Sequence, residues 1–75
     1  MSNYKKIAFN LKHQRDKYNL SRSKAILMLK NNYGIDISVN RLRELENGKR
    51  LPRIDEIDSL AKLYNINPLK LTGWR

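Results

Sequence analysis

The sequence contains no cysteine, which excludes disulfide bonds and thiolate metal sites. Its one histidine, His13, cannot by itself build a zinc site or a histidine-based catalytic triad. No apolar run approaches the roughly 20 residues that a membrane-spanning helix needs, and no signal peptide precedes the first polar segment. We therefore expect a cytoplasmic protein with no metal, no cofactor and no membrane contact.

The chain is also short, at 75 residues. This is about half the usual size of one domain, so we expect a single domain over residues 1–75 with one small core. The sequence pairs no nucleophile with a base and contains no metal-ligand set and no phosphate-binding loop. We therefore do not expect an enzyme.

Positive charge dominates what the sequence does contain. Sixteen Lys and Arg stand against seven Asp and Glu, which gives a net charge of +9. Residues 1–30 carry eight basic side chains and one acidic side chain, whereas residues 54–75 carry three of each. Such an excess indicates a polyanionic partner, with nucleic acid ahead of an anionic membrane surface. A basic surface that only keeps the protein soluble is the alternative.

Apolar spacing and helix-capping residues predict five short helices and no sheet. The first, over residues 4–18, has apolar side chains three, four and seven residues apart. The stripe consists of Tyr4, Ile7, Ala8, Leu11 and Tyr18. The second helix starts at Ser21, which caps its free amides, and ends at Gly34, which readily adopts a left-handed conformation.

The last three helices have similar signals. Ser38 caps the third, which buries Leu42 and Leu45 and ends at Asn47-Gly48, residues that favour positive φ. The fourth helix follows Pro52, and Asn67-Pro68 opens a one-turn fifth helix that stops at Gly73. The stripe expected to face the core in the fourth helix is Ile54, Ile57, Leu60, Ala61 and Tyr64.

The segment ISVNRLRELENGKRLP, residues 37–52, resembles the Cro and phage-repressor (Xre-like) type of helix-turn-helix domain. The matching positions are Ser38, Leu42, Leu45, Glu46, Gly48 and Pro52. Agreement extends over roughly residues 7–72. The resemblance implies a compact, all-α, five-helix, lambda-repressor-like domain that binds double-stranded DNA. The interval from Ser21 to Ser38 is about six residues longer than usual in the family, so we expect a lengthened second helix and turn.

The third helix is expected to read bases in the major groove. At 100° per residue, the face opposite Leu42 and Leu45 holds Asn40, Arg43, Glu44 and Asn47. Asparagine bonds bidentately to adenine, and glutamate accepts a hydrogen bond from cytosine N4, so Asn40 and Glu44 are the expected central readers. The resemblance adds Val39 at a groove-contact position, where packing against the second helix is the alternative.

Two basic segments are expected to hold phosphates. Free amides at the start of the second helix bind anions, and the resemblance places this segment against the DNA backbone. The loop after the third helix would hold the backbone from the other side. The expected contacts are Ser21, Arg22, Ser23, Lys24, Ser38, Arg41, Asn47, Lys49, Arg50 and Arg53. A solvated helix face is the alternative for Arg41 and Arg43, which are also able to reach guanine.

The resemblance further implies a structural ion pair between Arg15 and Glu46, which join the first helix to the third. The expected function is a sequence-specific regulator, a repressor, that binds DNA as a homodimer. The alternative is a protein-interaction module, an adaptor, antirepressor or antitoxin-like protein. It rests on four consecutive apolar residues, 26–29, which cannot all face one core. A carboxy-terminal apolar patch of Ile66, Leu69, Leu71 and Trp74 could serve a second subunit.

Overall fold

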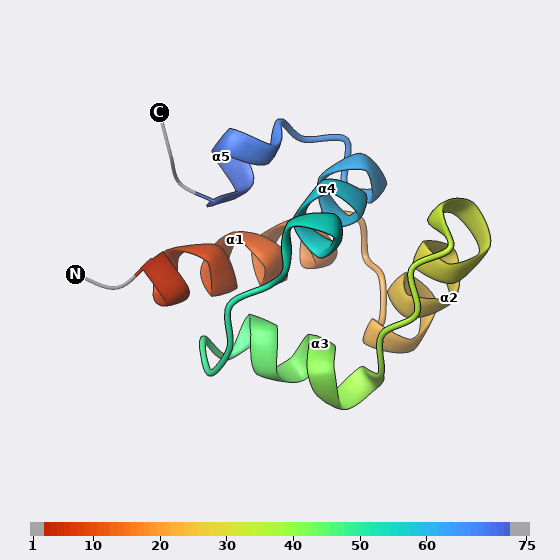
Figure 1. Cartoon of the computed structure of the whole chain (residues 1–75), viewed down its shortest axis with the longest axis horizontal. Coiled ribbons are helices and arrows are strands. Elements are labelled where there is room, and N and C mark those ends of the chain that lie inside the picture. Colours follow the sequence, from red (N-terminus) through yellow and green to blue (C-terminus); the bar gives the residue numbers. More distant parts are fainter. Residues whose placement is uncertain (1–2, 73–75) are drawn as a thin grey trace.

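The computed structural model describes residues 3–72, and over that range it is all-helical, as expected (Figure 1). The five helices are α1 (Asn3–Lys17), α2 (Arg22–Tyr33), α3 (Val39–Glu46), α4 (Ile54–Leu63) and α5 (Pro68–Thr72). Helix α1 runs through the middle of the molecule, with α3 on one side and α4 and α5 on the other. The predicted roles of the Tyr4 side chain, Gly73 and Trp74 concern groups outside the described residues.

The predicted caps explain where the central helices begin and end. The Ser21 hydroxyl oxygen accepts a hydrogen bond from the Lys24 amide, and the Ser38 hydroxyl oxygen accepts one from the Arg41 amide, each at 3.0 Å. Helix α2 stops at Gly34, whose φ of 68° is left-handed. The second helix has 12 residues, and an irregular connection leads from it to α3.

Every helix contributes apolar side chains to one core. Leu11 of α1, Leu29 of α2, Leu42 of α3, Leu60 of α4 and Leu71 of α5 are all fully buried. Burial of a leucine side chain contributes roughly 1.5–3 kcal/mol, so these contacts hold the short helices together. The core thereby fixes α3 at the surface with its opposite face turned outward.

Some predicted core positions are exposed. Ile54 is 86% exposed, because the inward position in the first turn of α4 is taken by Glu56, two residues later and on the opposite side of the helix. Tyr18 and Tyr33 sit at helix ends and are partly exposed, whereas Tyr64 is fully buried. The end of α3 also differs in detail: Asn47 has a φ of −93°, and Gly48 alone makes the positive-φ turn.

The two stacked tyrosines Tyr18 and Tyr64 place their hydroxyl groups in different situations. The Tyr18 hydroxyl donates to the Tyr64 backbone carbonyl at 3.0 Å. The Tyr64 hydroxyl is buried and has no hydrogen-bond partner among the described residues. Its burial raises the pKa of Tyr64 above the ordinary value.

Tyr64→Phe is expected to raise the free energy of unfolding by about 1 kcal/mol, because phenylalanine keeps the buried ring and removes the unpaired hydroxyl. Tyr18→Phe is the matched control and should lower it by about 1 kcal/mol, because it removes a hydrogen bond. Urea denaturation of both variants measures the two changes. A destabilised Tyr64→Phe protein would contradict this account of the buried hydroxyl.

Candidate nucleic-acid interface

Helix α3 presents a polar face outward because its apolar residues anchor it from behind. Leu42 and Leu45 are fully buried, while Asn40, Arg43 and Asn47 are exposed and Glu44 is half-buried. This agrees with the face expected from 100° per residue. We call Asn40, Arg43, Glu44 and Asn47 the reading face, after the base-reading role that the sequence predicts for this side of the helix.

Hydrogen bonds within the chain orient the side chains of the reading face. Arg43 Nη1 donates to Asn40 Oδ1 at 2.8 Å. Arg50 Nε lies 3.3 Å from Glu44 Oε1, so the loop after α3 reaches back to this face. Both pairs are exposed to solvent and therefore weak, which lets the side chains exchange these partners for another polar ligand.

The first turn of α3 offers an apolar side chain beside the reading face. Val39 is 37% exposed, so its methyl groups are accessible at the start of the helix. Ser38, just before it, is exposed as well, although its hydroxyl oxygen already accepts from the Arg41 amide. A serine hydroxyl that accepts in this way still has its own proton to donate.

A buried carboxylate, Glu46, joins α3 to both preceding helices. Arg15 of α1 donates from Nε to Oε2 at 2.7 Å and from Nη2 to Oε1 at 3.0 Å. The bidentate pair that the resemblance implies is therefore present. The hydrogen bonds with Glu46 raise the pKa of Arg15 above its ordinary value, which keeps the pair charged.

Arg22 also binds this carboxylate. Its Nε donates to Glu46 Oε1 at 3.0 Å, and its side chain is 28% exposed. The sequence predicts a phosphate contact here, because Arg22 adds positive charge to the amides and hydroxyls at the start of α2. In the structure its side chain holds the start of α2 against the end of α3.

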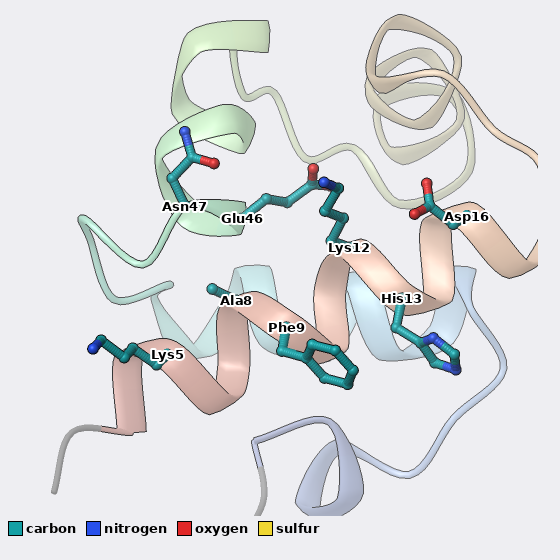
Figure 2. Close-up of a pocket in the computed structure, with 8 residues that line it drawn as sticks. All are labelled: Lys5, Ala8, Phe9, Lys12, His13, Asp16, Glu46 and Asn47. Carbon is teal, nitrogen blue, oxygen red and sulfur yellow. The ribbon is translucent and has the colours of Figure 1, made fainter.

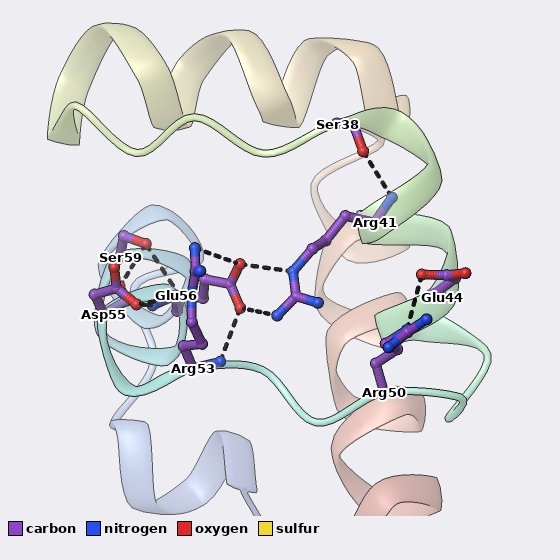
Figure 3. Close-up of polar contacts among 8 residues, drawn as sticks. All are labelled: Ser38, Arg41, Glu44, Arg50, Arg53, Asp55, Glu56 and Ser59. Atoms are coloured by element: carbon purple, nitrogen blue, oxygen red, sulfur yellow. Dashed lines mark hydrogen bonds and ion pairs between the residues drawn. The ribbon is translucent and has the colours of Figure 1, made fainter.

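A second buried carboxylate, Glu56, joins α3 to α4 (Figure 3). Arg41 donates to both of its oxygens, from Nε at 2.9 Å and from Nη2 at 2.8 Å. Glu56 also accepts from the Arg53 backbone amide at 2.8 Å, and Arg53 Nη2 lies 3.5 Å from Oε2. Arg41, which the sequence places at a phosphate or at guanine, thus binds Glu56 in the structure.

Sequence reasoning missed Glu56, although one signal for it was present. A glutamate three residues after a helix N-cap commonly reaches back to the cap amide, as Glu56 does to Arg53. Burial alone raises the pKa of Glu56. The hydrogen bonds from Arg41 and the Arg53 amide, together with the positive charges of the Arg41 and Arg53 side chains, outweigh this effect. The net effect holds the pKa below its ordinary value.

The start of α2 keeps several anion-binding groups exposed. The Lys24 amide is used by the Ser21 cap and the Ala25 amide by the Ser21 carbonyl. The amides of the first two helical residues have no acceptor within the helix, so they remain at its positive end. Ser21, Ser23 and Lys24 are exposed around these amides.

The loop of residues 47–53 runs back along α3. The Lys49 amide donates to the Glu44 carbonyl at 3.0 Å, which folds the loop against the end of the helix. The loop then reaches Arg53, beside Arg41 and Glu56. Lys49, Arg50 and Arg53 are all exposed, so the loop lines one side of the reading face with positive charge.

This geometry, an outward polar helix supported by two buried carboxylates and bordered by cations, agrees with the comparison with known families. A family model described as helix-turn-helix matches residues 11–71. The chain belongs to the helix-turn-helix family, of the Cro and phage-repressor type. No curated protein and no solved structure matched the sequence.

Membership of the helix-turn-helix family makes DNA the partner of this chain, since the family consists of DNA-binding regulators. None of the described helices is long and apolar enough to cross a membrane. Over residues 3–72, no three metal-ligating side chains gather at one place. The helix-turn-helix unit itself is α2 and α3, joined by residues 34–38.

The Arg41–Glu56 pair predicts a pH-dependent contribution to stability. The folded state holds the pKa of Glu56 below its ordinary value of 4.5, so the stabilisation is complete above that pH and is lost as pH falls below it. Glu56→Gln is expected to lower the free energy of unfolding by about 2 kcal/mol at pH 7. The difference from wild type should shrink at pH 3.

Urea denaturation at both pH values provides the measurement. Asp58→Asn is the matched control, because its carboxylate makes a surface pair with Lys62 at 3.1 Å. Such an exposed pair contributes less than about 0.5 kcal/mol. An equal loss for Glu56→Gln at pH 7 and pH 3 would show that the charge of Glu56 does not contribute.

Proposed function

We propose that the chain is a sequence-specific regulator of transcription, a repressor, that inserts α3 into the major groove of double-stranded DNA. The supporting observation is the exposed polar face of α3, a helix that the ion pairs of Glu46 and Glu56 hold on its buried side. A helix fixed by its buried side can present the other side in one orientation. Base readout requires such an orientation, because hydrogen bonds to base edges are directional.

Within the reading face, Asn40 and Glu44 are proposed as the central readers. Asn40 is able to bond adenine at N6 and N7, and Glu44 to accept from cytosine N4. On binding, Asn40 exchanges its weak partner Arg43 for a base, and Glu44 exchanges its weak partner Arg50 for a base. Arg43, once released, reaches guanine, and Val39 contacts a thymine methyl group.

Phosphates are proposed to bind on both basic borders of the reading face. Those at the start of α2 meet the free amides, Ser21, Ser23 and Lys24. Phosphates at the loop after α3 meet exposed cations. The proposed loop contacts are Asn47, Lys49, Arg50 and Arg53, with Ser38 at the start of α3. Arg22 and Arg41 are proposed mainly to hold α3, since they donate hydrogen bonds to buried carboxylates and are 28% and 27% exposed, whereas Arg53, which also lies near Glu56, is 67% exposed.

We further propose that residues 1–75 act as one domain in the cytoplasm and bind DNA as a homodimer. Two-fold regulators of this kind place their reading helices about 34 Å apart on one side of the duplex. The described chain measures 34 × 23 × 22 Å, so two copies fit on neighbouring turns. Leu69, 56% exposed on α5, is available to a second subunit. Sedimentation with and without bound DNA tests the dimer.

Affinity for duplex DNA is expected to fall steeply with salt. Each phosphate contact releases counterions, so the slope of log affinity against log salt should be near −0.9 per contact. Fluorescence anisotropy of a labelled duplex across a salt series measures this slope. A flat response would contradict the proposal.

Alanine substitutions should separate readers from phosphate contacts. Asn40→Ala or Glu44→Ala is expected to narrow the gap between a selected site and random DNA, by about 1–3 kcal/mol. Lys49→Ala is the matched control, because it should weaken both kinds of DNA about equally. If all three variants behaved alike, the division into readers and phosphate contacts would be wrong.

The alternative, a protein-interaction module, has one supporting observation. Leu27 is 51% exposed on α2, as expected from a run of four apolar residues. A flat salt response together with loss of partner binding in a Leu27→Ser variant would favour it. DNA binding that is unaffected by Leu27→Ser would leave α3 as the functional surface.

A further inference from the structure

We propose that the DNA contact extends from α3 onto α1, where Lys5 and Lys12 bind phosphates of one strand beside the base pairs read by α3. This inference rests on the proposed function. It adds a third phosphate-binding surface to the two basic borders described above. We call this surface the α1 cleft.

The α1 cleft is a hollow of about 470 Å³ between α1 and the end of α3. Lys5, Lys12 and His13 line it from α1, and Glu46 and Asn47 line it from α3 (Figure 2). Lys5 and Lys12 are seven residues apart, so they lie on the same face of α1, about 10 Å apart along its axis. That length matches a short run of neighbouring phosphates along one strand.

Asn47 joins the α1 cleft to the reading face. It lines the α1 cleft, and it also lines a second hollow formed with Asn40, Arg43, Glu44 and Lys49. A duplex that occupies the reading face therefore passes the mouth of the α1 cleft at Asn47. The lysines on α1 lie on the continuation of that surface.

The charges around the α1 cleft favour an anion. Glu46 is a carboxylate, but its side chain is fully buried and accepts three hydrogen bonds from Arg15 and Arg22. Asp16 also lines the α1 cleft and is exposed, and Arg15, 3.9 Å away, partly offsets the negative charge of Asp16. Lys5 and Lys12 are exposed, so their ammonium groups remain available at the surface.

Three single variants and one double variant test the inference. Lys5→Gln, Lys12→Gln and their combination remove charge from the α1 cleft. Lys70→Gln is the matched control, since it removes one exposed positive charge from α5 instead. The probe is a long duplex that the wild type enriches from a random-sequence pool, and thermal denaturation checks that all variants fold.

Lys12→Gln is expected to weaken binding about 3- to 10-fold and to reduce the salt slope by about 0.9, with a larger effect in the double variant. Lys70→Gln should change affinity less than about twofold. Phosphate ethylation should block wild-type binding at a short run of phosphates beside the read base pairs. In the double variant, ethylation of those phosphates should no longer reduce binding.

Two outcomes would overturn the inference in distinguishable ways. If the wild type binds DNA but Lys12→Gln and Lys70→Gln have equal effects on affinity, the α1 cleft is not part of the contact. The proposed role of α3 would then still stand. If the wild type enriches no duplex, the proposed function fails and this inference fails with it.

Discussion

The rest of the structure depends on two buried carboxylates that hold the reading helix. Glu46, at the end of α3, binds arginines from α1 and α2, and Glu56, on α4, binds Arg41 near the start of α3. Helix α3 has only eight residues, too few to be stable alone. Its position therefore comes from tertiary contacts. Burial of Leu42 and Leu45 holds the helix against the core, and the ion pairs of Glu46 and Glu56 fix its orientation.

Burying a charge is costly unless the partner geometry is good, and here it is good at both sites. Arg15 and Arg41 each bind their carboxylate with two donors, and Glu56 takes a third hydrogen bond from the Arg53 amide. The same arrangement uses three of the chain's arginines to fix the angle of α3, whereas Lys49, Arg50 and Arg53 stay exposed in the loop after it.

Helix boundaries and the reading face could be predicted from the sequence because their causes are local. Ser21, Ser38 and Gly34 determine helix ends through nearby backbone groups, and Leu42 and Leu45 determine which face of α3 turns inward. The partner of Arg41 depends on a residue fifteen positions away, on another helix. Ile54 was misplaced for a related reason, since its apolar side chain matched the stripe while Glu56 took the inward position.

The start of α2 and the start of α3 are each fixed by contacts of their own. The contact between α2 and α3 at Glu46 is made by Arg22, the first residue of α2. At its other end the helix stops at Gly34, and the chain returns through the buried Ile37. Because Ile37 joins the core just before Ser38, the start of α3 is fixed independently of how long α2 is. Additional residues at the end of α2 would therefore leave both contacts in place.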